Sequence, residues 1–337
     1  MRTILHVGTH KTGTTTIQQF ANRRAPQLRE AGLWYPGYDL IGLKRHPAHH
    51  DFSHAVAGTL STLTFEQAND FVAAIARGAG DAGHVLLSAE PIYRHVIPEK
   101  TKTTEEYWAA RDAYIARLAE VTAPLEPEIL IVLRRQDDFS RSLYQENVKA
   151  RHMRQDFRSF LKSRLANFQY LEQINLFKKY FKIVDIAIFE DLAEDGQLLR
   201  NFFHHIGIEI GKIDKIAEFN ESLPIELVEF KRQLNRADLS KQQLASISRA
   251  LLDIGQVEGF PRGSDLDWIP ASEMTAFMDR FAEANAQIFA MMKNPPGRDT
   301  LFPPGRVRTE VFEGLSMERF KAINALVLQR ILADGAR

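Results

Sequence analysis

Residues 4–16 read Ile4-Leu5-His6-Val7-Gly8-Thr9-His10-Lys11-Thr12-Gly13-Thr14-Thr15-Thr16. The segment begins as a short apolar run, passes through a loop bounded by two glycines, and leads into residues 17–24, which have a helical composition. A strand, a loop and a helix in this order present backbone N–H groups at a helix N-terminus, where partial positive charge collects and anions bind. The segment therefore predicts an anion-binding turn at the start of an α/β fold.

The loop comes close to the phosphate loop of nucleotide triphosphatases, whose pattern is G-x-x-x-x-G-K-[ST]. Gly8 and Gly13 have the required spacing, but Thr14 stands at the lysine position and the lysine, Lys11, lies inside the loop. A triphosphatase would lose its hold on the β- and γ-phosphates in this arrangement, so we expect a different phosphate-bearing ligand. The alternative is that the two glycines serve only a tight strand-to-helix turn.

A second candidate anion site follows the apolar run of residues 129–133, which shows no alternation and predicts a parallel strand buried on both faces. Arg134 comes at the carboxyl end of this strand, the edge where ligands bind in open α/β sheets. Ser142 falls on the helix that we expect next. A guanidinium can hold two oxygens of one phosphate while a hydroxyl donates to a third. The alternative is an arginine pair at the sheet edge, neutralised by Asp137 and Asp138.

Strands and helical segments alternate up to about residue 190, and the remainder is mainly helical. Strands separated by helices imply a parallel sheet with right-handed crossovers. We therefore predict a three-layer α/β fold resembling the P-loop proteins, in one domain spanning 1–337, with an α/β core over 1–190 and a helical part over 191–337. Beyond the segments already named, the expected helices are 65–77, 105–122, 157–164, 171–181, 198–206, 225–234, 241–254, 271–292 and 317–333, with a further strand over 183–189.

Composition excludes several classes of protein. The chain of 337 residues has 43 basic and 43 acidic residues and no cysteine. Zero net charge without a basic block argues against a nucleic-acid partner, and the lack of cysteine rules out disulfides. No apolar run approaches the roughly 20 residues that span a bilayer. The first strand starts near Met1 and leaves no room for a signal peptide, so we expect a cytoplasmic protein.

The loop Thr9–Thr16, taken with Leu133-Arg134-Arg135-Gln136-Asp137-Asp138 and the later Ser142 and Tyr144, resembles the sulfotransferases, in particular the bacterial carbohydrate-type enzymes. These enzymes take a sulfuryl group from 3′-phosphoadenosine 5′-phosphosulfate (PAPS) and leave adenosine 3′,5′-bisphosphate. The resemblance implies that Arg134 and Ser142 hold the 3′-phosphate. It implies a binding site for the 5′-phosphosulfate made by His10, Lys11, Thr12, Gly13, Thr14, Thr15 and Thr16.

Other parts of the chain match this family more loosely. Residues 220–223 and 283–289 look like segments seen there, whereas Arg135-Gln136 stands where many members have Asn-Pro. The loop that closes over the adenosine in several relatives has no clear counterpart. We assign that place to Arg262, within residues 260–264, and the alternative is an ordinary solvated turn.

Sulfuryl transfer resembles phosphoryl transfer in its loose, in-line transition state. Charge develops on the oxygen that bridges the sulfur to the departing phosphate, and a lysine inside the loop can stabilise it. We therefore expect Lys11 to act on the leaving group. The transferred group carries little charge and no acidic pair lies beside the loop, so no metal is expected.

The acceptor hydroxyl needs a base as its bond to sulfur forms. Glu90 is the first candidate, because it follows a short apolar strand over 84–88 and would lie at a carboxyl strand end with Lys11 and Arg134. A capping or ion-paired surface glutamate is the alternative. His50 is the rival base, within the histidine-rich loop 43–54. That loop matches no standard zinc spacing, so we expect it to line the acceptor pocket; a solvated loop with a helix start capped by Asp51 is the alternative.

The expected activity is sulfuryl transfer from PAPS to a hydroxyl or amine, with a glycan, a glycolipid or a small hydroxyl compound as acceptor. Two alternatives remain: a kinase with a degenerate phosphate loop, and a nucleotide-binding scaffold without activity. The sequence does not identify the acceptor or the oligomeric state.

Overall fold

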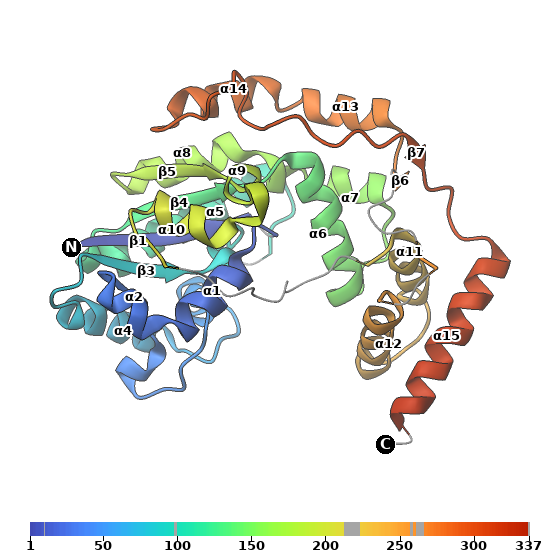
Figure 1. The fold of residues 1–337 in the computed structure, drawn as a ribbon, viewed down its shortest axis with the longest axis horizontal. Coiled ribbons are helices and arrows are strands. Elements are labelled where there is room, and N and C mark those ends of the chain that lie inside the picture. The colour runs from blue at the N-terminus through green and yellow to red at the C-terminus, as the bar shows by residue number, and fades with distance from the viewer. Residues whose placement is uncertain (10, 98–99, 212–222, 257–258, 261–265, 336–337) are drawn as a thin grey trace. The chain divides into compact units, whose positions relative to one another are not determined.

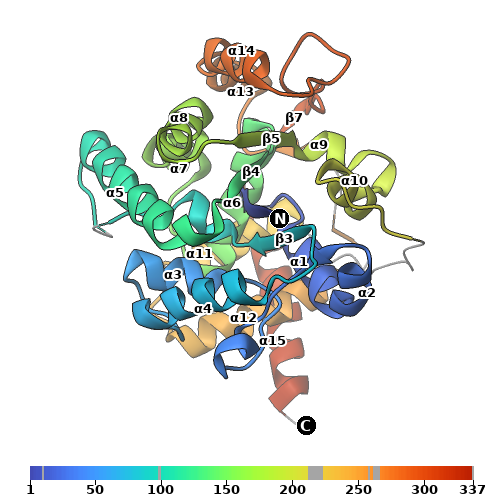
Figure 2. The same cartoon turned by 90° about the vertical axis from the view of Figure 1, so that its left-hand side faces the viewer.

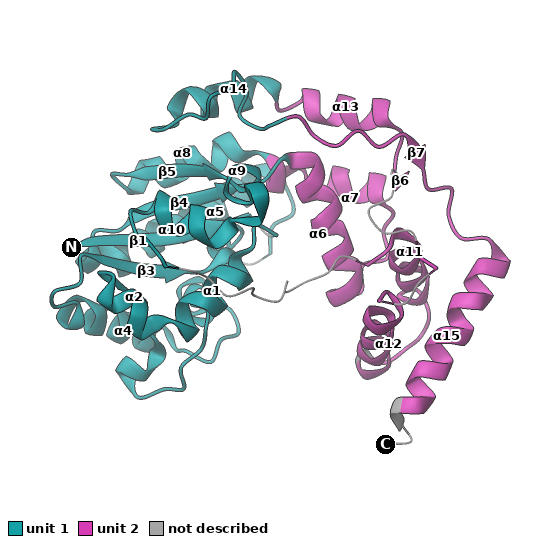
Figure 3. Cartoon of the chain, in the orientation of Figure 1, with its two compact units in different colours: residues 1–135, 169–219, 282–303 teal, residues 136–168, 220–281, 304–337 magenta. Residues whose placement is uncertain are grey.

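The computed structural model describes residues 1–9, 11–97, 100–211, 223–256, 259–260 and 266–335 (Figure 1). The chain divides into two compact units, each assembled from segments far apart in the sequence (Figure 3). Unit 1 comprises 1–135, 169–219 and 282–303, and unit 2 comprises 136–168, 220–281 and 304–337. The single domain over 1–337 stays a prediction.

Unit 1 is built on a five-stranded sheet in the order β2-β3-β1-β4-β5, in which every pair is parallel. The strands are β1 (Arg2–Gly8), β2 (Leu33–Trp34), β3 (His84–Ser88), β4 (Glu128–Leu133) and β5 (Val184–Ile188). The predicted α/β fold with a central parallel sheet is therefore confirmed. The apolar runs of β1 and β4 are buried throughout, as continuous hydrophobic strands in parallel sheets are.

The order of the strands creates a switch point beside β1. After β1 the chain builds β2 and β3 on one side of it, then returns to lay β4 and β5 on the other. The connections that leave the carboxyl ends of β1 and β4 therefore diverge. Open α/β sheets bind ligands in the crevice that such diverging connections leave.

Helices cover both faces of this sheet (Figure 2). One face packs against α1 (Thr14–Arg23), α2 (Ala25–Glu30), α9 (Phe189–Leu192) and α10 (Leu198–His205) in one hydrophobic cluster that includes Ile4, Leu86 and Val132. The opposite face is covered by α3 (His50–Ala57), α4 (Phe65–Gly78), α5 (Thr104–Thr122) and α8 (Tyr170–Tyr180). Helix α14 (Ala282–Met291) packs against α8.

Local sequence sets several of these helix starts. In α4 the side chain of Thr64 accepts from the Gln67 amide while the Gln67 side chain accepts from the Thr64 amide. Thr103 and Glu106 form the same capping box at α5. Such reciprocal bonds satisfy amides that the helix itself leaves without acceptors. These two predicted helices are confirmed to within one residue.

Unit 2 is mainly helical, and it includes residues 136–168 in addition to segments of the predicted helical part over 191–337. Its helices are α6 (Gln136–Ala150), α7 (Phe157–Ser163), α11 (Ile225–Leu234), α12 (Lys241–Ile254), α13 (Ala271–Asp279) and α15 (Met317–Gly335). Aromatic rings fill its core, with Tyr144 lying 5.2 Å from Phe157 and 5.0 Å from Trp268 between ring centroids. A short parallel pair, β6 (Leu266–Asp267) with β7 (Glu310–Val311), was not predicted.

The helix predicted over 271–292 is wrong as a single element. It is two helices, α13 and α14, and the break falls at Arg280 and Phe281. The Phe281 amide bonds the Met278 carbonyl at 2.9 Å, an i to i−3 turn that ends the regular ladder. The rings of Phe277 and Phe281 are both buried, with centroids 5.1 Å apart. No glycine or proline marks the break, so tertiary packing decides it.

Candidate anion-binding site

The loop after β1 is folded by its own polar groups. The Thr9 amide donates to the Val132 carbonyl at 2.9 Å, which extends the β1–β4 ladder by one bond. The Thr12 hydroxyl donates back to the Thr9 carbonyl at 2.8 Å and lies 3.2 Å from the Thr14 hydroxyl. Helix α1 then begins with the bond from the Ile17 amide to the Gly13 carbonyl. The loop is therefore a defined turn that ends at a helix N-terminus.

Two residues of this turn have left-handed backbone conformations, Lys11 with φ of 70° and Gly13 with φ of 69°. A Cβ at position 13 would also overlap the terminal methyl of Leu198, so that side chain would have to shift. Lys11, in contrast, carries a side chain. A residue other than glycine pays roughly 1–2 kcal/mol for the left-handed backbone conformation. Strain of this kind persists where the surrounding structure enforces it, and it concentrates at binding sites.

The turn presents donors to an anion. Gly13 is the N-cap of α1, and no side chain of a described residue caps the first turn. Thr15 is exposed and Thr16 is half-buried, whereas Thr12 and Thr14 are buried with hydroxyls bonded inside the loop. The uncapped amides and the helix dipole favour negative charge at this point. His10 lies outside the described residues.

Arg134 faces this loop from the end of β4. Its Nη1 donates to the Lys11 carbonyl at 2.9 Å, and its guanidinium lies 5.1 Å from the centroid of the Phe189 ring. The Tyr170 hydroxyl donates to the Arg134 carbonyl at 2.7 Å and fixes the backbone there. Among the described residues, Arg134 Nε is buried and makes no hydrogen bond. A full positive charge is therefore fixed beside the anion-binding turn.

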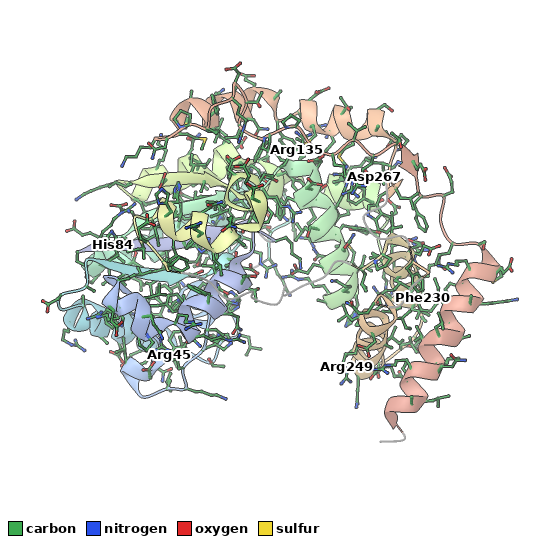
Figure 4. The ribbon with its side chains drawn as sticks, viewed as in Figure 1. Arg45, His84, Arg135, Phe230, Arg249 and Asp267 are labelled. Atoms are coloured by element: carbon green, nitrogen blue, oxygen red, sulfur yellow. The ribbon has the colours of Figure 1, made fainter. Side chains whose placement is uncertain are left out.

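The next residue, Arg135, bonds two other segments of unit 1. The backbone amide of Arg135 donates to Glu190 Oε1 at 3.0 Å, and its Nη1 donates to the Pro303 carbonyl at 3.4 Å. Figure 4 labels Arg135 at the end of β4, and His84 at the opposite, amino end of the sheet. Arg135 is therefore tied to Glu190 and Pro303, whereas Arg134 bonds the loop.

The two aspartates that follow serve a different arginine. In unit 2, Arg141 pairs with Asp137 and Asp138 at 3.1 Å each and with Asp267, the residue labelled in Figure 4, at 2.5 Å. This explains Asp137 and Asp138 as structural partners within unit 2. Ser142 lies on α6 in unit 2 and is half-buried. Its action with Arg134 on one phosphate stays a prediction.

Both candidate bases belong to unit 1, at or just beyond the carboxyl end of β3. Glu90 opens a short 3₁₀ turn (Glu90–Tyr93) directly after this strand, and the preceding Ala89 amide bonds the His6 carbonyl of β1 at 3.1 Å. His50 is the first residue of α3, and its Nε2 lies 3.4 Å from the amide nitrogen of Gln18 on α1. Glu90 and His50 are therefore at the same edge of the sheet as the loop, and which of them acts stays open.

The other histidines of the 43–54 loop have structural partners. His49 is buried and bonds the Pro36 carbonyl at 2.8 Å through Nε2, while its Nδ1 accepts from the Ser88 amide at 2.9 Å. Burial lowers its pKa to about 4. Asp51 does not cap α3: its carboxylate accepts from the Thr62 hydroxyl at 2.7 Å. Within the described ranges, no group of three or more potential ligands could hold a metal ion.

Sequence reasoning missed a polar cluster beneath the loop, formed by His6, Ser88 and Gln18. The His6 and Ser88 side chains are 2.9 Å apart, and the Gln18 amide nitrogen lies 3.1 Å from both oxygens of Ser88. The sequence feature that could have indicated this cluster is His6 itself, a single histidine inside an otherwise apolar strand. Arg262 and residues 220–222, which the sequence also singled out, lie outside the described residues.

Comparisons with known proteins add little to this geometry. No protein-family model matches the chain, and no curated protein matches it. Among solved structures, a sulfotransferase from Alicyclobacillus acidocaldarius is similar at 14% identity and a TM-score of 0.39, covering 75% of this chain and 95% of its own. A similarity this low carries no argument about what the chain binds or catalyses. In the part of the chain described, no helix is long and apolar enough to cross a membrane.

Proposed function

We propose that this protein transfers a sulfuryl group from PAPS to a hydroxyl or amine of an acceptor, with a carbohydrate or glycoconjugate as the preferred class. One observation carries the proposal: Lys11 occupies a strained turn at the N-terminus of α1, at the switch point of a parallel sheet, and Arg134 donates to its carbonyl. This arrangement gathers two cations and uncapped amides where a phosphosulfate would bind.

Lys11 is assigned to the leaving group. In a loose transition state, charge accumulates on the phosphate oxygen that departs from sulfur, and a fixed ammonium group stabilises it. A lysine after the second glycine would lie one turn further along, on the helix. The chain instead has Thr14 there and accepts backbone strain to keep the lysine within the loop.

The remaining roles are part of the same proposal. The amides and hydroxyls around Thr15 and Thr16 hold the 5′-phosphate, and Arg134 holds the 3′-phosphate together with Ser142. Glu90 takes the proton of the acceptor, with His50 as the alternative base. A glutamate works as a base near neutral pH where partial burial raises its pKa toward that range.

Calorimetric titration with adenosine 3′,5′-bisphosphate in the absence of magnesium tests the proposal. We expect saturable binding of one equivalent and no hydrolysis of ATP with magnesium. Magnesium-dependent ATP turnover would favour the kinase instead. Donor binding without transfer to a panel of glycans, glycolipids and small alcohols would favour an inactive scaffold.

Variants separate the assigned roles. Lys11→Ala should lower transfer by about 100-fold or more, the scale seen when one oxyanion donor is removed. Arg134→Ala should weaken binding of the bisphosphate by roughly tenfold or more, because a charge-assisted hydrogen bond is lost. Lys182→Ala and Arg77→Ala, which remove exposed cations of the same unit, are the matched controls. Unchanged transfer in Lys11→Ala would remove the leaving-group role.

The choice of base has its own test. Glu90→Gln should depress turnover while leaving bisphosphate affinity unchanged, and His50→Gln should do little. The opposite ranking would move the base to His50. Equal, complete activity in both variants would exclude the two candidates.

A further inference from the structure

His6 is a buried polar residue that the roles above leave unused. It lies in the middle of β1 between Leu5 and Val7, and it is fully buried. Its Nδ1 lies 2.9 Å from the Ser88 hydroxyl, and its ring packs 4.8 Å from that of Phe202. Its other nitrogen, Nε2, is buried and makes no hydrogen bond to any residue that the structure describes. An unsatisfied buried nitrogen costs roughly 1–3 kcal/mol, so it calls for a reason.

Nε2 lies beside Gly8, where β1 enters the anion-binding turn of residues 9–13 (called the anion loop below). If Gly8 carried a Cβ, that atom would lie 2.6 Å from the Thr12 hydroxyl, 3.2 Å from the Thr14 hydroxyl and 3.7 Å from His6 Nε2. These three polar atoms therefore surround the space that the missing side chain leaves. The backbone of Gly8 is ordinary strand, so this space, and not backbone freedom, is the reason for a glycine here.

The hydrogen bonds around this space define a direction for the protons. The Thr12 hydroxyl donates its one proton to the Thr9 carbonyl. In the contact between the Thr12 and Thr14 hydroxyls, Thr14 must therefore be the donor. Thr14 Oγ1 then retains lone pairs that can accept. When the Ser88 hydroxyl donates to Nδ1 of His6, the imidazole carries its own proton on Nε2, the nitrogen that borders the space beside Gly8 together with the Thr14 hydroxyl.

We propose that His6 is a positioning residue for the anion loop, whose Nε2–H donates to the Thr14 hydroxyl when an anion is bound and thereby fixes the Thr14–Thr12–Thr9 chain of hydrogen bonds. The proposal rests on the proposed function in one respect, that the loop binds the 5′-phosphate. Locking the first turn of α1 in this way pre-organises its amides for the phosphate and lowers the cost of binding.

The role belongs to a neutral imidazole. Burial lowers the pKa of His6 to about 3, opposed only partly by the charge of Glu90. His6 therefore adds no charge to the loop near neutral pH. Its effect on binding should depend on where its N–H lies and not on pH between 6 and 8.

Two substitutions distinguish the nitrogens, because an asparagine amide reaches the position of Nδ1 and a glutamine amide that of Nε2. We expect His6→Asn to keep the Ser88 contact but to bind adenosine 3′,5′-bisphosphate about tenfold more weakly, a change of about 1.4 kcal/mol. His6→Gln should bind within about threefold of the natural protein, a difference below 1 kcal/mol. Melting temperatures are measured alongside, since a purely structural role would affect both variants alike.

Thr14 supplies an independent check if a His6 variant does not fold. Thr14→Val should weaken binding as His6→Asn does, and Thr14→Ser should restore it. In the double variant His6→Asn/Thr14→Val, the two losses should not add, because both remove the same bond. Equal affinity of the asparagine and glutamine variants, or full additivity in the double variant, would overturn the proposal. Failure of the natural protein to bind the bisphosphate would instead overturn the proposed function.

Discussion

Replacing Gly13 with alanine should destabilise unit 1 by about 2–5 kcal/mol, from two separable causes. A left-handed backbone at a residue with a Cβ costs roughly 1–2 kcal/mol, and Gly13 has φ of 69°. The added methyl group would also overlap the Leu198 side chain, and overpacking of this kind costs roughly 1–3 kcal/mol. The second term arises because α10 packs directly on the turn.

Two further variants measure the terms one at a time. Gly42 has φ of 74° with nothing within 4 Å of its would-be Cβ, so Gly42→Ala should show the backbone cost alone. Leu198→Ala in the Gly13→Ala background removes the colliding atoms and should recover the overpacking term, which a double-mutant cycle isolates. Urea unfolding followed by circular dichroism gives the free energies. The reasoning is refuted if Gly13→Ala costs no more than Gly42→Ala, or if the double variant is strictly additive.

Three other predictions follow from the same structure. Lys11→Gly should raise the free energy of unfolding by about 0.5–1 kcal/mol by releasing strain, yet abolish sulfuryl transfer; a destabilised variant would show that the turn is not strained. Arg141→Met should cost about 3–5 kcal/mol in urea unfolding, because Asp267 would be left buried without its partner, and adding Asp267→Leu should recover much of it. Burial lowers the pKa of His6 to about 3 and of His49 to about 4, so each is neutral when folded and takes up a proton on unfolding. Their contribution is complete above pH 6.5 and is lost as the pH falls from there toward 4, by up to about 1.4 kcal/mol per pH unit for each histidine; unfolding curves with no pH dependence between 7 and 5 would contradict this.

Much of the fold follows from local patterns. The apolar runs around Ile4 and Ile129 predict buried parallel strands, and their burial on both faces confirms them. Capping signals such as Thr64 and Thr103 locate helix starts closely, since a capping box depends on residues only three apart. The loop between Gly8 and Gly13 could likewise be predicted to open a helix, because the relevant bonds are local.

Other features depend on residues that are distant in the sequence. The contact of Arg134 with the Lys11 carbonyl joins positions 123 residues apart, and it exists because β1 and β4 are neighbours in the sheet. The pairing of Arg141 with Asp137, Asp138 and Asp267 could not be predicted from the sequence, which equally allowed Asp137 and Asp138 a place beside Arg134. Charge and spacing in the sequence identify candidate residues such as Lys11 and Arg134. Which of them come into contact depends on the tertiary structure, here on the pairing of β1 with β4.

The amino-acid sequence by itself determined the buried strands β1 and β4, the capped helices α4 and α5, and the glycine-bounded turn with a lysine inside it, because these depend on propensity, period and local hydrogen bonding. Tertiary structure alone decided that His6 lies beneath the turn, that the Leu198 side chain lies where a Cβ at position 13 would be, and that the 271–292 segment breaks in two. Each of these features depends on packing between elements. A shift of a few ångströms between two elements changes which atoms come into contact, and a local sequence pattern contains no information about that distance.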